Sequence, residues 1–261
     1  MPIIIQAPIR RLSQAEFGEL AYAVMGCVFE IHSEFGRFFD EKIYKRELAQ
    51  RFPGVGLEVP IEVTYASFTK LQYLDVLVAF GGLFEFKAAE AFVPRHPAQL
   101  LHYLLLAELG HGKLVNVRTE SVEHEFVNTT LTCEDRIEFG IIDTHWNVQT
   151  PGAQSFRDVL VAILRDWGTG LDLLIYEDAL THLLGGESHV LSNVEVLTPQ
   201  HTLGHQKMRL AAPRVAFTLT ALPEADPDFE SHLRRLHRHT DLEAILWANI
   251  ALKKVTFTTI R

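Results

Sequence analysis

The chain has 261 residues, of which 48% are hydrophobic and 22% charged, and its formal net charge is −9. This composition is typical of a globular protein with one large domain or two modest ones. Two cysteines, Cys27 and Cys133, are too few for a disulfide framework and favour a reducing, cytoplasmic environment. No apolar run approaches the roughly 20 residues of a membrane span, and the N-terminus lacks the pattern of a signal peptide. The acidic charge argues mildly against nucleic acid as a partner, although metal-binding carboxylates would contribute to that charge.

Helical and strand-like patterns alternate over residues 1–128. Ser13 and Glu16 have the spacing of a capping box at the start of a long amphipathic helix. In chain order, the predicted elements are a helix over 13–35, a helix over 39–51, strands over 57–66, 70–80 and 83–88, a helix over 96–109, and strands over 113–119 and 124–128. We expect a turn at Gly81-Gly82 between the second and third strands. The order predicts a mixed α/β domain.

Periodicity weakens over residues 129–153, where we expect a linker with extra elements. The predicted elements after it are helices over 154–167 and 168–186, strands over 188–198, 205–212 and 214–222, a charged helix over 226–250, and a last strand over 253–260. The second half, residues 154–261, therefore predicts another α/β domain with a mixed sheet flanked by helices.

The two halves also share residues at matching positions. Residues 36–48 align without gaps on 168–180, with identities at Gly36/Gly168, Asp40/Asp172, Ile43/Ile175, Tyr44/Tyr176 and Leu48/Leu180. After a one-residue slip, the strand with Glu85 and Lys87 overlays the strand with Thr218 and Thr220. This pattern favours an internal duplication in which the second copy kept the order of helices and strands and lost the charged residues. The alternative is a chance similarity between two α/β halves.

Three charged residues of the first half are candidates for catalysis. Glu85 and Lys87 are two residues apart on a predicted strand and therefore face the same side. Asp75 lies on the preceding strand, and hairpin pairing would bring it towards their level. Two converging carboxylates suit Mg²⁺ or Mn²⁺, and a nearby ammonium group can orient water or stabilise a phosphoryl transition state. A salt bridge without a catalytic role is the alternative.

Residues 20–125 resemble the GxxExxY family of bacterial proteins, a branch of the PD-(D/E)xK nuclease-like superfamily. The segments that carry the resemblance are GCVFEIHSEFG (26–36), GRFFDEKIYKREL (36–48), LDVLV (74–78) and EFKAAEAFVPRHPAQLLHYL (85–104). Glu41 and Tyr44 are similar to the Glu and Tyr of the signature. Arg37 and Phe38 replace its usual Pro-Gly, which is a departure in the signature loop.

Together with the internal repeat, the resemblance predicts two tandem PD-(D/E)xK-like domains, the second degenerate and acting as a scaffold or pseudo-dimer partner. Its implied site comprises the metal ligands Asp75, Glu85 and Glu30, the catalytic Lys87, the helical polar residue Gln99, and the rim or substrate residues Glu41, Tyr44 and Tyr103. The repeat pattern qualifies two of these residues. Tyr44 has a counterpart in the second half, Tyr176, which favours a structural role for Tyr44. Glu41 aligns with Leu173 and has no such counterpart, which favours a place in the site or on its rim.

The function that these observations predict is a Mg²⁺- or Mn²⁺-dependent nuclease that acts on DNA or RNA, with no membrane partner. One alternative is a nuclease-like binding or regulatory protein without turnover, which the acidic charge and the degenerate second half motivate. Another is a hydrolase of a smaller phosphorylated substrate. The basic stretch HLRRLHRH (232–239) is better interpreted as a solvated helix face than as a phosphate contact.

Overall fold

The computed structural model describes residues 3–224 and 226–261, and the chain forms two compact units. The first unit comprises Met1–Thr64 and Thr69–Thr132. The second comprises Tyr65–Phe68 and Cys133–Arg261. Of residues 129–153, expected to be a linker with extra elements, residues 133–153 belong to the second unit and contain α4 (Cys133–Ile137) and β7 (Gly140–His145).

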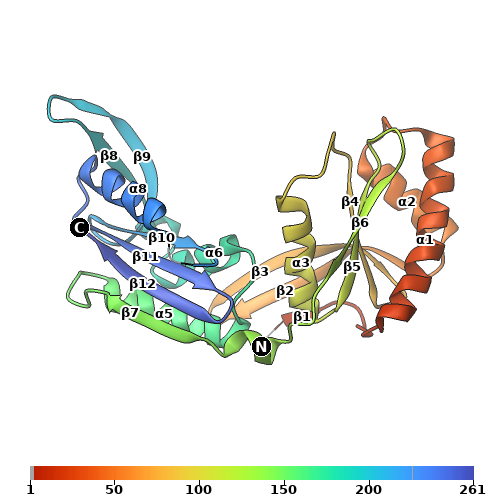
Figure 1. The fold of residues 1–261 in the computed structure, drawn as a ribbon, viewed down its shortest axis with the longest axis horizontal. Helices are drawn as coiled ribbons and strands as arrows, with labels where there is room; N and C mark the ends of the chain where they lie inside the picture. Colours follow the sequence, from red (N-terminus) through yellow and green to blue (C-terminus); the bar gives the residue numbers. More distant parts are fainter. Residues whose placement is uncertain (1–2, 225) are drawn as a thin grey trace. The chain divides into compact units, whose positions relative to one another are not determined.

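The first unit is a six-stranded sheet with helices on both sides (Figure 1). Its elements are β1 (Ile3–Ile5), α1 (Gln14–Phe35), α2 (Glu41–Arg51), β2 (Val55–Tyr65), β3 (Phe68–Val78), β4 (Gly82–Lys87), α3 (Arg95–Ala107), β5 (His111–Asn116) and β6 (Glu123–Asn128). The strand order is β1-β2-β3-β4-β5-β6. Strand β4 pairs antiparallel with β3 and parallel with β5, because helix α3 carries the chain back across the sheet.

Helix α1 begins as its sequence predicts. The Ser13 hydroxyl accepts a hydrogen bond from the Glu16 amide, and the Glu16 carboxylate accepts one from the Ser13 amide at 2.8 Å. This capping box satisfies two amides that have no partner inside the helix. Gly36, at φ 71°, ends the helix in a backbone conformation that favours glycine.

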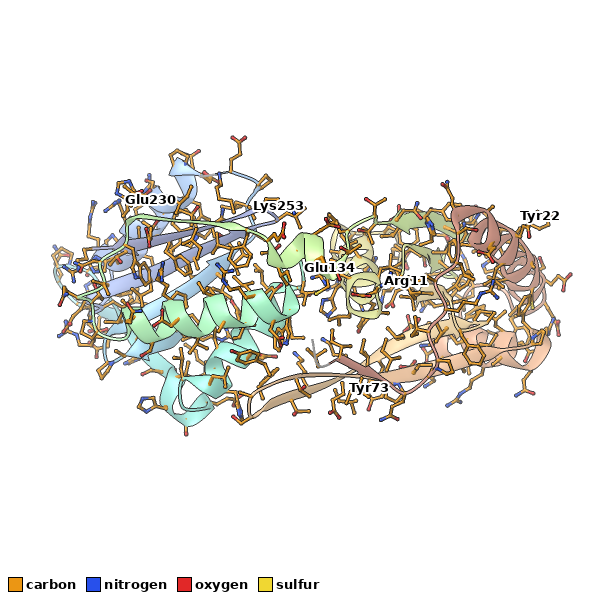
Figure 2. All side chains as sticks on the ribbon, turned by 90° about the horizontal axis from the view of Figure 1, so that it is seen from below. Arg11, Tyr22, Tyr73, Glu134, Glu230 and Lys253 are labelled. Atoms are coloured by element: carbon orange, nitrogen blue, oxygen red, sulfur yellow. The ribbon has the colours of Figure 1, made fainter. Side chains whose placement is uncertain are left out.

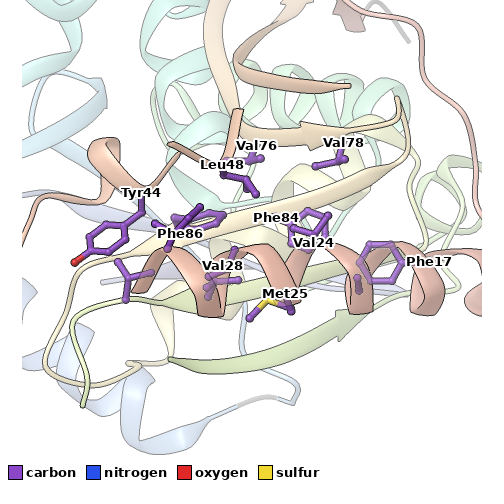
Figure 3. Close-up of a cluster of buried hydrophobic side chains, with 14 residues drawn as sticks. Phe17, Val24, Met25, Val28, Tyr44, Leu48, Val76, Val78, Phe84 and Phe86 are labelled. Atoms are coloured by element: carbon purple, nitrogen blue, oxygen red, sulfur yellow. The ribbon is translucent and has the colours of Figure 1, made fainter. Parts of the chain in front are cut away.

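The core of the first unit lies between α1, α2 and one face of the sheet. Alternate residues of β4 take part: Phe84 and Phe86 are fully buried and pack with Phe17 and Val24 of α1 in the cluster shown in Figure 3. Each such aromatic side chain contributes roughly 1.5–3 kcal/mol when it leaves water. Glu85, between the two phenylalanines, faces the other side of the sheet, where α3 packs. The alternation of β4 therefore separates core from candidate chemistry.

The turn between β3 and β4 differs from the expected Gly-Gly turn. Ala79 and Phe80 occupy it, both at positive φ, and the Gly81 amide donates to the Val78 carbonyl at 3.1 Å. Gly81 is required for another reason: a Cβ there would lie 2.3 Å from the backbone oxygen of Arg10. Close packing, and not turn geometry, explains this glycine.

The second unit contains another six-stranded sheet, in the order β7-β12-β11-β10-β9-β8. Its elements are α4 (Cys133–Ile137), β7 (Gly140–His145), α5 (Ala153–Trp167), α6 (Leu173–Leu183), α7 (Glu187–Val190), β8 (Leu191–Leu197), β9 (Thr202–Ala212), β10 (Val215–Thr220), α8 (Pro227–Arg238), β11 (Ala244–Ala251) and β12 (Lys254–Ile260). The expected helix over 226–250 is wrong beyond Arg238. Residues 244–251 form β11, a strand buried on both faces, which is why its apolar run lacks an alternating pattern.

The sheets of the two units are built on the same core pattern. In the first unit β3, β4 and β5 pair antiparallel and then parallel, and β9, β10 and β11 do the same in the second. A helix connects the parallel strands in both units, α3 in one and α8 in the other. Strands β6 and β12 then add antiparallel to β5 and β11.

Two tyrosines make the same hydrogen bond in the two units. The Tyr44 hydroxyl donates to the Gly36 carbonyl at 2.5 Å, and the Tyr176 hydroxyl donates to the Gly168 carbonyl at 2.5 Å. Both tyrosines are buried, Tyr44 on α2 and Tyr176 on α6, and each glycine follows the preceding helix, α1 or α5. The bond ties the end of one helix to the next.

Two asparagines clamp the segment after the central strand in the same way. Asn116 accepts a hydrogen bond from the Ala89 amide at 3.2 Å and donates to the Ala89 carbonyl at 2.8 Å. Asn249 accepts from the Leu222 amide at 2.8 Å and donates to the Leu222 carbonyl at 3.0 Å. The side-chain amide continues the pairing where the neighbouring strand has ended. Among the described residues, no helix is long and apolar enough to cross a membrane.

Candidate active site

Asp75 and Glu85 come together where the regular pairing of β3 and β4 ends. That ladder aligns Val76 with Phe84 and Val78 with Gly82, so Asp75 and Glu85 are the next residues on the two strands. The Phe86 amide donates to Asp75 Oδ2 at 2.7 Å. The side chain of Asp75 thus replaces a backbone acceptor where the chain leaves regular pairing, which fixes its carboxylate beside β4.

Glu85 is a buried carboxylate, and only one of its two oxygens has a hydrogen-bond partner. The residue is only 2% exposed, and its Oε1 accepts a hydrogen bond from Lys87 Nζ at 2.7 Å. Oε2 is buried and has no hydrogen-bond partner in the structure. Burial, and then the charge of Asp75, raises the pKa of Glu85 to about 7. A buried acceptor without a partner is unfavourable in a folded protein and marks a position where a proton or a cation would bind.

Lys45 of α2 links Asp75 to a second carboxylate. Its ammonium group bonds to Asp75 Oδ1 and lies 2.6 Å from Glu58 Oε1. Burial disfavours the charged form, but the hydrogen bonds to Asp75 and Glu58 raise the pKa of Lys45 overall. Glu58 holds a φ of 48°, a strained conformation for a residue with a side chain. Sequence reasoning missed both Lys45 and Glu58.

Lys87 is positioned by residues from β4 and α3. Besides Glu85, its ammonium group donates to Gln99 Oε1 at 3.1 Å. Tyr103, one turn further along α3, forms a hydrogen bond with Gln99, and burial raises the pKa of the Tyr103 hydroxyl. An ammonium group has three donors, so one donor of Lys87 remains for a water or a substrate oxygen. The structure thus brings Lys87, Gln99 and Tyr103 together.

The helical acid near these carboxylates is Glu41 and not Glu30. Glu41, at the start of α2, is half-buried, with its Oε1 4.0 Å from Lys45 Nζ. Burial, followed by the charge of Asp75, raises the pKa of Glu41. Glu30 is exposed on α1 and lines a different cavity, since Val28 and Ile31 take the core-facing positions. The structure does not bring Glu30 to the expected metal site.

Tyr44 also lies away from the expected rim. It is buried in the α1–α2 core and its ring stacks on His32, with centroids 6.4 Å apart. Its hydroxyl is occupied by the Gly36 carbonyl. A substrate cannot contact a side chain so enclosed, so the expectation of a rim position is wrong and the structural interpretation of Tyr44 fits.

The donor set suits a hard divalent cation with few protein ligands. Glu41, Glu58, Asp75 and Glu85 are four carboxylates, and the two ammonium groups near them leave two negative charges when all are ionised. The free Oε2 of Glu85 faces this acidic surrounding. In the described ranges, no group of three or more His, Cys, Asp and Glu side chains has the arrangement of a metal cage. Asp75 and Glu85 are the carboxylates that would hold Mg²⁺ or Mn²⁺ with several waters retained, and both oxygens of Asp75 already accept hydrogen bonds.

Residues 18–129, from α1 through β6, match the family model of the PD-(D/E)XK nuclease superfamily. The match covers less than half of the chain and shows that its first half is similar to this superfamily. It names the superfamily and not its GxxExxY branch. No curated protein and no solved structure matches the chain.

Proposed function

We propose that the first unit is a metal-dependent nuclease of the GxxExxY branch that hydrolyses phosphodiester bonds of DNA or RNA. The observation that carries the proposal is the buried Glu85, with an unpartnered oxygen, next to Asp75 and bonded to Lys87. The nuclease superfamily match over the same residues supports it.

Each residue of the cluster would have a separate task. Asp75 and Glu85 would hold Mg²⁺ or Mn²⁺, and the bound ion would supply the positive charge that acidifies a water and polarises the phosphodiester. Lys87, held by Glu85 and Gln99, would direct its remaining proton to the attacking water or to a phosphate oxygen. Tyr103 would keep Gln99 in place.

The test is cleavage of labelled single- and double-stranded DNA and RNA by the full chain with Mg²⁺, with Mn²⁺ and with EDTA. We expect metal-dependent cleavage of at least one substrate. Asp75→Asn, Glu85→Gln and Lys87→Met should each lower the rate by at least about 100-fold, the usual effect of removing one group that stabilises the transition state.

Two matched controls separate this site from the rest of the chain. Glu30→Gln removes the acid that the structure places elsewhere, and Thr218→Ala alters the counterpart of Glu85 in the second unit. Both should retain the wild-type rate. Absence of cleavage across the panel with either ion, or a wild-type rate for Glu85→Gln, would contradict the proposal.

One observation favours a second candidate, a nuclease-like binding protein without turnover. The Lys45 ammonium group already neutralises Asp75, so a cation has to compete with it. Calorimetry with Mn²⁺ distinguishes the candidates. Binding that is lost in Glu85→Gln supports the nuclease, whereas no binding in the wild-type protein supports the silent alternative.

We further propose that the second unit is a degenerate copy of the first, which serves as a scaffold. The same strand pairing, the two tyrosine–glycine bonds and the two asparagine clamps support a common origin. At the position of Lys87 it has Thr220, whose hydroxyl accepts a hydrogen bond from Trp247 Nε1 at 2.8 Å and donates one to Asn249 Oδ1 at 2.8 Å. These groups are satisfied by one another and leave no ammonium group for catalysis.

A further inference from the structure

A cavity lies in the first unit, on the α1 side of the sheet. Its volume is about 800 Å³, within the range of small-molecule sites. Apolar side chains form much of its lining, among them Met25 and Phe29 of α1, Phe52 after α2, and Phe126 of β6. Tyr22 at its margin is 85% exposed and projects from α1 (Figure 2).

Lys113 of β5 brings a buried positive charge to this cavity. It pairs with Phe84 in the sheet, so its side chain lies on the α1 face, opposite to that of Glu85. The residue is only 3% exposed, and its ammonium nitrogen lies 3.5 Å from the centroid of the Phe126 ring. Burial lowers the pKa of Lys113.

The described residues give Lys113 no carboxylate partner. Glu30 lines the same cavity, but no ion pair joins the two. Arg51, which also lines it, is neutralised by Glu34 at 2.7 Å and Glu47 at 2.6 Å. A buried cation without a counter-ion is unfavourable, and a cation–π contact offsets only part of that cost. An anionic group of a ligand would supply the missing partner.

The backbone of α1 leaves room for such a ligand. Gly18 and Gly26 both line the cavity, and a Cβ at either position would meet nothing within 4 Å. Glycine inside a helix costs up to about 1 kcal/mol relative to alanine. Because these two residues have no side chain, they leave open the space that larger side chains would fill.

We propose that this cavity binds a small amphipathic carboxylate, with its carboxyl group on Lys113 and an apolar body along α1. A single buried cation at the base of an apolar cavity selects a slender ligand with one negative head. A protein surface would instead need several charges or a broad contact. The site is separate from the Asp75–Glu85 cluster, and its existence does not depend on nuclease activity.

The test compares decanoate with decan-1-ol, which has the same chain and no charge, by calorimetry on the full protein. Decanoate should bind at least tenfold more tightly. In Lys113→Met, which replaces the ammonium group by an unbranched apolar chain one atom shorter, the preference should fall to within twofold while decan-1-ol still binds. Gly26→Phe, which fills the cavity, should abolish binding of both ligands.

A second measurement locates the ligand. Cys27 lines the cavity, whereas Cys133 belongs to the second unit. Decanoate should slow alkylation of Cys27 by N-ethylmaleimide and leave Cys133 unchanged in the same sample, as mass spectrometry would show. Equal binding of the two ligands, or an unchanged preference in Lys113→Met, would overturn the proposal. A dimer that Gly26→Phe dissociates would also overturn it, since the cavity would then be an interface between copies.

Discussion

Glu85→Gln should make the metal-free protein more stable at alkaline pH. Burial and the charge of Asp75 raise the pKa of Glu85 from 4.5 to about 7. Between these values the unfolded chain has released the proton and the folded chain still holds it, so stability falls as the pH rises and is constant above about 7. At 1.36 kcal/mol per pKa unit, the wild-type protein loses about 3 kcal/mol over this range. Glutamine has nearly the same shape and does not ionise, so the variant avoids this loss.

The assay is urea unfolding in EDTA at pH 5, 6, 7 and 8.5. Trp146, Trp167 and Trp247 all belong to the second unit, so their fluorescence follows that unit and is an internal control. Hydrogen exchange of peptides from β3 and β4 follows the first unit. The stability of the variant relative to the wild-type protein should increase by about 3 kcal/mol from pH 5 to pH 8.5 in the exchange data and stay constant in the fluorescence data.

A stability difference that does not vary with pH would refute the reasoning, because it would mean that Glu85 ionises equally in the folded and unfolded chains. Saturating Mn²⁺ gives a further check. The ion should stabilise the wild-type protein and leave Glu85→Gln unchanged, which reverses the order seen in EDTA.

Two further predictions concern packing and pairing around the site. Lys45→Met should destabilise the first unit by about 3 kcal/mol, because it leaves Asp75 buried without its partner; a double-mutant cycle with Asp75→Asn should be non-additive, and additive effects would exclude the pairing. Gly81→Ala should cost at least about 2 kcal/mol, since its Cβ would collide with backbone, whereas Gly26→Ala should stabilise the helix by up to about 1 kcal/mol. Urea unfolding measures both, and equal effects of the two glycine variants would contradict the packing argument.

Local signals predicted much of the first unit. The capping box at Ser13 and the period-two pattern of β4 depend on neighbouring residues, which the sequence displays directly. Strand β11 was missed because an apolar run such as AILWANIA suits a buried strand and a buried helix equally. Its identity as a strand comes from the parallel pairing with β10, which is a tertiary contact.

Strand periodicity and pairing predicted the candidate site only where its residues share one hairpin, whereas Gln99, Tyr103 and Glu41 came from the family resemblance. Asp75, Glu85 and Lys87 follow from strand periodicity and pairing about one turn. Lys45 comes from α2 and Glu58 from β2, and only tertiary packing brings them together beside Asp75. The i, i+4 spacing of Glu41 and Lys45 was the one available signal, and such pairs are common on exposed helices.

The asparagine clamp has a consequence for how activity can be gained and lost. The side chains of Asn116 and Asn249 hold the main-chain groups of Ala89 and Leu222, two residues beyond Lys87 and Thr220. Asn249 also accepts a hydrogen bond from the Thr220 hydroxyl, whereas Lys87 bonds to Glu85 and Gln99, so the same clamp forms with different side chains at that position. A backbone held in this way keeps its shape when point substitutions remove the reactive side chains. It would also keep its shape if further substitutions restored them.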